Sequence, residues 1–137
     1  MASSFPKSLD TLHGSAEFLV KRIAEMSGGK FQIQLFAAGE IVPGPGVHDA
    51  VKDGTVEIGF TCSYYYFGKE PTYCIDTAIP FGMNARQVKA WYRQGNGQKL
   101  MNEFFAKSNL MSIPSGNTGV QMGGWYRKEI KSAADFK

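Results

Sequence analysis

The feature that most constrains this 137-residue sequence is a strand–helix–strand pattern. Residues 30–36 alternate apolar and polar side chains, as a half-buried strand does. A Gly- and Pro-rich loop over 37–46 leads into a short helix-compatible stretch, 47–52, and residues 55–62 (TVEIGFTC) form a second predicted strand. A unit of about 30 residues in this order has parallel strands, because the crossover returns the chain to the same end of the sheet. The sequence therefore predicts an α/β fold with a parallel-rich βαβ sheet.

Helices are predicted to flank this sheet. Between residues 8 and 27, apolar side chains recur at steps of three and four, so they share one face of a helix. Gly28 and Gly29 follow the last turn, where glycine ends a helix without steric cost. The other predicted elements are helices over 85–95 and 98–107, strands over 110–114 and 120–127, and the beginning of a helix at 132.

Both ends of the sequence look unfinished for an α/β domain. The first residues form a loop just before the first helix, where such a domain normally has its first strand. The last residues, SAADFK, begin a helix without a closing signal. We therefore expect a fragment truncated at both ends, with the first strand missing or reduced to Met1 and Ala2.

Composition excludes several classes of protein. The formal net charge is +3 and the basic residues are dispersed, whereas nucleic-acid binding needs a clustered basic face. The sequence has no apolar run of about 18 residues that would cross a membrane. Its start lacks the pattern of a signal peptide, as the mature form of an exported protein also would. Cys62 and Cys74 do not make a disulfide framework, and the sequence leaves open whether they pair.

Catalytic motifs are also missing from the sequence. No serine lies in a GxSxG pattern, and no CxxC, HExxH or P-loop motif is present. The two histidines, His13 and His48, are expected to be solvated at the surface, and His48 with Asp49 alone does not make a set of metal ligands. The chain is therefore predicted not to be an enzyme.

A binding site has better support. Ligands of open parallel sheets lie beyond the carboxyl ends of the strands, and the segments 2–6, 63–68 and 115–119 meet this condition. The tyrosine hydroxyls of the second segment offer polar contacts on an apolar ring. The amide of Asn117, in the third segment, can both donate and accept hydrogen bonds.

The same residues also have purely structural interpretations. Two of the consecutive tyrosines 64–66 would be core residues and one exposed, because neighbours on a strand point to opposite sides. Asn117 would use its side chain within its own turn. Gln121, between two apolar neighbours on a predicted strand, is either paired within the structure or faces a ligand.

Five segments carry a family resemblance. They read SSFPKSLDTLHG, FAAGEIVPG, DAVKDGTVEIG, SYYYFGK and NTGVQMGGWYRKEIKSAADFK, in order and over nearly the whole chain. Together they resemble the solute-binding subunit of tripartite ATP-independent periplasmic (TRAP) transporters, in the branch that binds 2-oxo acids. The resemblance implies an α/β, periplasmic-binding-protein type II-like fold, whose two lobes close on a small carboxylate such as pyruvate without catalysis. It also implies a periplasmic location, delivery to TRAP membrane permease subunits, and a homodimer as one arrangement of the full-length protein.

The resemblance also divides the chain. Residues 1–119 would form the first lobe, with its first strand largely missing. Residues 120–130 would be a hinge strand between the lobes, and residues 131–137 would begin the second lobe.

The resemblance further assigns ligand contacts. Phe5, Tyr64 and Tyr65 would line the first-lobe wall, and Asn117 would bond the ligand. Gln121 would help to hold a metal cation, such as sodium, that bridges to the ligand, and no covalent cofactor is implied. In the family an arginine soon after the SAADFK-like segment pairs with the carboxylate, and no such residue lies within these 137. We therefore expect weak or absent binding by the 137 residues alone.

The alternative to a transport receptor is a stand-alone α/β module for protein interaction. Its support is the aromatic run over 64–67, which would then form an exposed apolar patch. A module built to associate should form a defined oligomer, and light scattering at several concentrations distinguishes the two interpretations.

Overall fold

The N-terminal residues lie in the middle of a small parallel sheet. The computed structural model describes residues 1–120 and 122–136, and its strands β1 (Ala2–Ser3) and β2 (Gly59–Phe60) pair in parallel. On its other side β1 forms a parallel bridge from Ala2 to Phe36. The Ser3 N–H donates to the Phe36 carbonyl over 2.8 Å, and the Ser4 N–H donates to the Phe60 carbonyl over 2.9 Å. The reduced first strand is therefore Ala2–Ser3, one residue later than expected, and it has neighbours on both sides.

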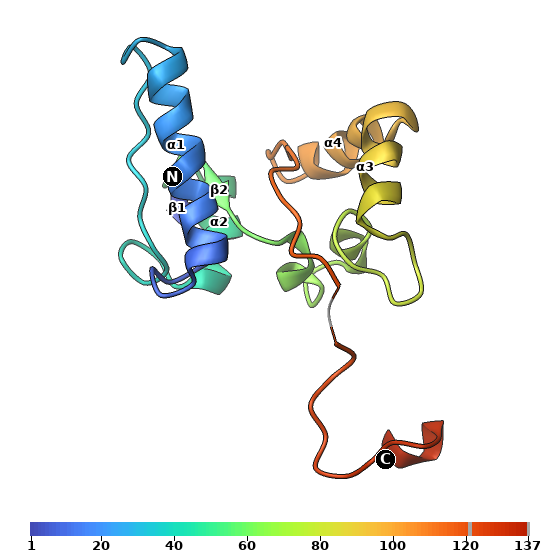
Figure 1. Cartoon of the computed structure of the whole chain (residues 1–137). Helices are drawn as coiled ribbons and strands as arrows, with labels where there is room; N and C mark the ends of the chain where they lie inside the picture. Colours follow the sequence, from blue (N-terminus) through green and yellow to red (C-terminus); the bar gives the residue numbers. More distant parts are fainter. Residues whose placement is uncertain (121, 137) are drawn as a thin grey trace.

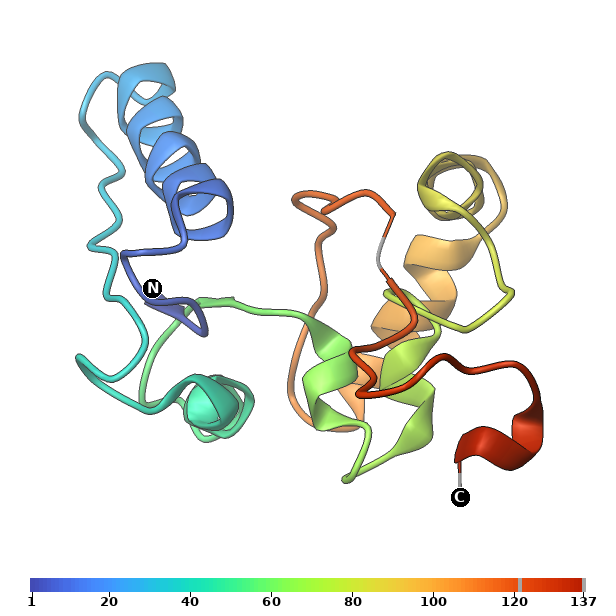
Figure 2. The same ribbon diagram turned by 60° about the horizontal axis from the view of Figure 1, so that its bottom comes forward.

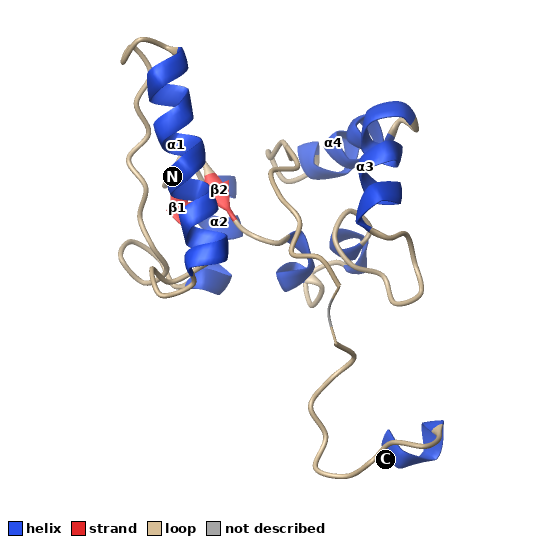
Figure 3. Cartoon of the chain, viewed as in Figure 1, coloured by secondary structure: helices blue, strands red, loops and turns tan. Residues whose placement is uncertain are grey.

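The predicted α/β class with parallel pairing is confirmed, but the strands are shorter than predicted. Residues 30–36 contribute the bridge at Phe36, and residues 55–62 contribute the two residues of β2. Backbone groups pair only where a neighbouring strand runs beside them, so the short β1 limits both partners. Figure 3 shows how little of the chain is strand.

Helices make up most of the regular structure. The predicted helix over 8–27 is a π-helical segment, η1, followed by α1, and the predicted helix over 47–52 is α2. Asn84 caps α3 through a reciprocal pair of hydrogen bonds with Gln87, which satisfies backbone N–H groups of its first turn. The helical elements are η1 (Asp10–Gly14), α1 (Ser15–Met26), η2 (Gly44–Gly46), α2 (Val47–Lys52), η3 (Ser63–Tyr66), η4 (Pro71–Cys74), α3 (Ala85–Gln94), α4 (Gly97–Ala106) and η5 (Ala133–Phe136). No helix among residues 1–120 and 122–136 is long and apolar enough to cross a membrane.

Two apolar clusters organise the molecule. The aliphatic cluster lies between the sheet and α2 and contains Ala2, Val47, Ala50 and Val56. The aromatic cluster lies between η3, η4, α3 and α4 and contains Tyr66, Tyr73, Tyr92, Met101 and Phe105. Figures 1 and 2 show the corresponding two groups of elements, joined by the chain that leaves β2.

The apolar face of α1 is only partly covered. Ala16 is buried, and Leu12 and Ile23 are half-buried. At the far end of the same face, Met26 is 81% exposed. The predicted helix is therefore present, but most of its apolar face contacts solvent.

The C-terminal quarter of the chain differs from its prediction. Strands were expected over 110–114 and 120–127, but the described residues of both stretches form no strand. Val120 is 102% exposed and Trp125 is 90% exposed, and among the described residues no strand runs beside this stretch to pair with its backbone. The helix beginning at 132 is present as η5, where Asp135 accepts hydrogen bonds from the N–H groups of Lys131 and Ser132. Figure 1 shows this red segment extending away from both groups of helices.

Candidate functional site

A cavity of about 350 Å³ lies beyond the carboxyl ends of the paired strands. It is lined by Ser4, Gly44, Pro45 and Tyr65. Ser4 follows β1 directly, and Tyr65 lies in η3, a few residues after β2. This is the edge of a parallel sheet at which α/β proteins bind ligands.

Phe5, Tyr64 and Tyr65 form an aromatic wall at this cavity, which Tyr65 lines. The Phe5 ring meets the Phe60 ring edge to face at 5.9 Å and the Tyr65 ring at 6.3 Å. The Tyr64 and Tyr65 rings are 4.7 Å apart. Phe5 is 3% exposed, whereas Tyr65 is 44% exposed, so Phe5 supports the wall and Tyr65 presents it to the cavity. The structure thus brings together Phe5, Tyr64 and Tyr65, the three aromatic residues that the family resemblance assigned to this wall.

The Tyr65 hydroxyl is held in its protonated form. Burial, followed by a hydrogen bond with the Tyr64 hydroxyl, raises the pKa of Tyr65 to about 12. A phenol with this pKa keeps its proton throughout the neutral range. Tyr65 can therefore donate a hydrogen bond to an anionic group but cannot act as a base there.

Close backbone approach shapes the opposite side of the cavity. A Cβ atom on Gly44 would lie 2.8 Å from the Ser4 carbonyl oxygen, which is closer than Cβ atoms approach other heavy atoms in real structures. The Ser4 hydroxyl donates to the Gly44 carbonyl over 2.8 Å. Glycine at position 44 thus lets the loop after Ala37 close against the end of β1.

Asp76 ties η3 to the rest of the aromatic cluster. Its carboxylate accepts a hydrogen bond from the Tyr92 hydroxyl over 2.9 Å and another from the Ser63 hydroxyl. Burial and then the Asp76 charge raise the pKa of Tyr92. Burial also raises the pKa of the neighbouring Cys62 thiol, and Cys62 and Cys74 are both free and half-buried. These contacts fix the turn that carries Tyr64 and Tyr65.

The expectation of solvated surface histidines is wrong. His13 is 3% exposed and His48 is 6% exposed. His48 packs between the Tyr66 and Tyr73 rings, with its Nε2 atom 2.7 Å from the Tyr73 hydroxyl. The sequence did not reveal this, because the aromatic partners of His48 are 18 and 25 residues away in the chain.

The three tyrosines follow the structural interpretation in part. Tyr66 is buried, Tyr64 is half-buried and Tyr65 is exposed. The three tyrosines lie on the tight turn η3 and not on a strand. Their different burial therefore comes from the geometry of a turn and not from the alternating faces of a strand. Phe67 is 57% exposed, and the burial of Tyr66 divides the aromatic run, so the four rings do not form one continuous surface patch.

Asn117 is not part of this wall. Asn117 lies in an exposed loop, and its side-chain oxygen accepts a hydrogen bond from the Gly119 N–H over 2.7 Å. That is the local turn interaction that its sequence context also allowed. Gln121 lies outside the described residues, so its ligand and cation roles stay predictions.

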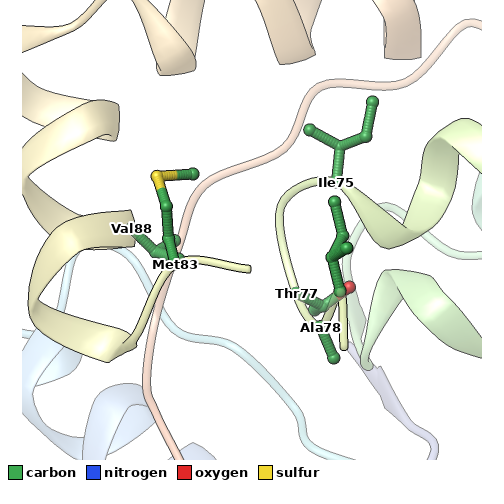
Figure 4. Close-up of a pocket in the computed structure, with 6 residues that line it drawn as sticks. Ile75, Thr77, Ala78, Met83 and Val88 are labelled. Atoms are coloured by element: carbon green, nitrogen blue, oxygen red, sulfur yellow. The ribbon is translucent and has the colours of Figure 1, made fainter. Parts of the chain in front are cut away.

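A second recess is too small for a solute. It lies between the chain after η4 and the start of α3, as Figure 4 shows, and its volume of about 20 Å³ is near that of one water molecule. It is lined by Ile75, Thr77, Ala78, Ile79, Met83 and Val88. The cavity at Ser4 and Tyr65 is therefore the better candidate for a binding site.

The fold is an α/β lobe: a parallel sheet with helices around it and a candidate binding cavity of hydroxyl and aromatic groups beyond its strand ends. The chain belongs to the family of bacterial extracellular solute-binding proteins, family 7, whose model matches residues 2–137. It is 53% identical over 137 residues to a monocarboxylate 2-oxoacid-binding periplasmic protein of Nostoc sp.. That match covers 100% of this chain and 37% of the relative.

Solved structures of TRAP solute-binding proteins have the same fold. One from Bordetella bronchiseptica, a mixed-occupancy dimer with calcium and picolinate in one site, is 50% identical with a TM-score of 0.93, covering 98% of this chain and 40% of that one. One from Colwellia psychrerythraea, with calcium and pyruvate, is 35% identical with a TM-score of 0.94, covering 99% and 42%. One from Pseudoalteromonas atlantica, with sodium and pyruvate, is 37% identical with a TM-score of 0.94, covering 99% and 41%. The predicted family and its periplasmic-binding-protein type of α/β lobe are thus confirmed, and the chain spans about two fifths of these relatives' length.

Proposed function

We propose that this chain is the first lobe of an extracytoplasmic TRAP receptor that captures a small 2-oxo acid, such as pyruvate, and delivers it to the membrane permease. The observation that carries this proposal is the cavity bordered by Ser4, Gly44 and Tyr65, in a lobe that superposes on pyruvate-bound relatives with a TM-score of 0.94. The Tyr65 hydroxyl supplies a donor for a carboxylate, and Phe5 supports the ring that carries it. The receptor acts in the periplasm as a homodimer or monomer, binds its ligand and catalyses no reaction.

The rest of the receptor completes the site. In this proposal residues 1–119 form the first lobe, 120–130 cross to the second lobe and 131–137 begin it. No described residue after Leu110 belongs to either apolar cluster, as expected for a segment that leaves the first lobe. Ligand then favours the closed state of the two lobes through contacts that only that state makes.

A cation is expected to accompany the carboxylate. Among residues 1–120 and 122–136, no three His, Cys, Asp or Glu side chains are grouped to hold a metal ion. We propose that Gln121 contributes one amide oxygen to a cation whose other ligands come from the bound solute and from the rest of the receptor.

A chimera tests this function directly. Residues 1–137 replace the matching 37% of the Nostoc relative, and calorimetry measures pyruvate binding in the presence of sodium or calcium. We expect the chimera to bind pyruvate and the isolated 137 residues to bind it weakly or not at all. The reason is that an open lobe leaves most of the ligand in water.

Two variants of the chimera sharpen the test. Tyr65→Phe removes the hydroxyl and keeps the ring, and should lower pyruvate affinity about tenfold, as expected for one hydrogen bond to a charged group. Phe67→Leu, at an exposed position outside the cavity lining, should leave affinity unchanged. A folded chimera that ignores 2-oxo acids, or tight binding by the isolated chain, would contradict the proposal.

A further inference from the structure

The cavity at Ser4 and Tyr65 is lined from both groups of elements. Gly44 and Pro45 lie in η2, which continues directly into α2, whereas Tyr65 lies in η3, beside the aromatic cluster. Figure 2 shows α2, in teal, next to the green turns η3 and η4, and ring contacts join them. The width of the cavity therefore depends on how α2 is held against η3.

His48 joins α2 to the aromatic cluster. The residue before it, Val47, is 0% exposed within the aliphatic cluster, so consecutive residues of one short helix contact the two clusters. His48 is 6% exposed, and its ring centroid lies 4.7 Å from that of Tyr66 and 5.1 Å from that of Tyr73. Its Nε2 atom lies 2.7 Å from the Tyr73 hydroxyl, and its backbone N–H donates to the Tyr66 hydroxyl over 3.2 Å. A buried polar ring with these partners is held in one position.

Asp49 and Lys69 make a second contact between the same elements. Asp49 Oδ1 lies 3.1 Å from His48 Nδ1, and the two Asp49 oxygens accept from the Lys69 ammonium over 3.0 and 2.9 Å. The hydrogen bond from Lys69 and then that from His48 lower the pKa of Asp49, so this carboxylate stays charged at neutral pH. Lys69 lies between η3 and η4, where its backbone N–H donates to the Tyr66 carbonyl over 2.8 Å. Asp49 thus orients the His48 ring and ties α2 to the turn after Tyr66.

We propose that His48 is a positioning residue, which holds α2 against the aromatic cluster and so fixes the width of the cavity between Gly44 and Tyr65. His48 is not among the residues that line the cavity, so it acts on a bound carboxylate only through its neighbours. Tyr66, which His48 contacts, is 3% exposed and adjoins Tyr65 in η3, so a shift of its ring would move the cavity wall. This inference rests on the proposed function, because it concerns affinity at the same site.

The test uses the chimera after it has been shown to bind pyruvate. His48→Phe keeps a ring between Tyr66 and Tyr73 but removes both ring nitrogens, and Tyr73→Phe removes the hydroxyl that Nε2 contacts. Each should lower pyruvate affinity about fivefold, the range of one hydrogen bond, with unchanged circular dichroism. Because both variants break the same contact, the double variant should bind within about twofold of either single variant.

Rescue separates positioning from a merely structural role. His48→Gln carries a side-chain amide that can both donate and accept, so it can pair with the Tyr73 hydroxyl, and it should bind pyruvate within about twofold of the unmodified chimera. Losses that add in the double variant, or a His48→Gln variant as weak as His48→Phe, would overturn the proposal. So would a folded Tyr73→Phe variant with a lower urea midpoint but unchanged affinity, since the contact would then serve stability alone.

Two exposed lysines cover the case in which the buried variants do not fold. Lys69→Met removes the partner of Asp49 and should lower pyruvate affinity about twofold, because an exposed ion pair contributes little. Lys99→Met breaks an ion pair with Glu103 inside α4 and should leave affinity unchanged. Equal affinities of these two variants would reject the positioning role. Absence of pyruvate binding in the unmodified chimera would instead reject the proposed function, so the two failures are distinguishable.

Discussion

At the two ends of this chain, the strand signal in the sequence and the strand found in the structure disagree in opposite directions. Residues 120–127 have the apolar content of a strand, yet their described residues form none and Val120 is fully exposed. Ala2–Ser3 has almost no sequence signal, yet it forms the middle strand of the sheet. The difference is that β1 lies between Phe36 and β2, whereas the described residues of the C-terminal stretch pair with no strand. Strand formation is therefore decided by available backbone partners more than by the propensity of the strand itself.

Side-chain burial also differs between the two ends of the chain. Ser3 is 1% exposed and Ala2 is 2% exposed, because sheet neighbours and α2 cover them. In the C-terminal stretch, Met122 is 70% exposed and Trp125 is 90% exposed. Side chains at the N-terminal end thus contribute to stability, and those at the C-terminal end contribute little until another surface covers them.

The largest difference between the two ends should come from a glycine exchange. Gly44→Ala places a Cβ atom 2.8 Å from the Ser4 carbonyl oxygen, so the backbone must shift, and we expect it to lower the free energy of unfolding by about 3 kcal/mol. Gly116→Ala, where no heavy atom lies within 4 Å of the added Cβ, is the matched control and should stay within about 0.5 kcal/mol. Urea unfolding followed by circular dichroism measures both. Equal effects would show that the contact between Gly44 and Ser4 does not exist in solution.

A pair of valines should give the next largest difference. Val47 is 0% exposed in the aliphatic cluster, and Val47→Ala should cost about 2 kcal/mol through lost apolar contact and the cavity left behind. Val120→Ala removes the same atoms from a side chain that already contacts solvent, and should cost less than about 0.5 kcal/mol. The same urea titration compares them. A costly Val120→Ala would mean that the C-terminal stretch packs against a surface in solution.

The sequence predicted the features that depend on local order. Apolar spacing located α1, α2, α3 and α4, and the strand–helix–strand pattern predicted the parallel pairing. The rule that ligands bind beyond strand ends selected the segments 2–6 and 63–68, and these segments lie in contact through the Phe5 and Tyr65 rings.

Features that depend on distant partners were missed. The burial of His48 requires Tyr66 and Tyr73, and the hydrogen bond between the Ser4 and Thr61 hydroxyls joins residues that are 57 positions apart. A single sequence carries no signal that pairs such residues. The strands predicted after Leu110 failed for the same reason, because periodicity reports which face would be buried but not whether a partner is present.

The smallest expected effect concerns acid sensitivity. A hydrogen bond from Lys7, 2.6 Å long, and another from the Ala37 N–H lower the pKa of Glu40. A carboxyl group whose pKa is lowered on folding stabilises the folded state above its unfolded pKa, and this contribution is lost as the pH falls through the folded pKa. Glu40→Gln should therefore lower the urea midpoint slightly at neutral pH, and the difference from the unmodified chain should vanish in acid.

Asp135 provides the matched comparison at the other end of the chain. Backbone N–H groups of Lys131 and Ser132 also lower its pKa, but they belong to the same short turn. Because that turn belongs to neither apolar cluster, Asp135→Asn should leave the urea midpoint unchanged at every pH. Both residues are exposed, so high salt should also reduce the difference in urea midpoint that Glu40→Gln causes at neutral pH. An acid-sensitive midpoint that depends on Asp135 and not on Glu40 would reverse the contrast between the two ends, since it would place the C-terminal turn inside the cooperative unit.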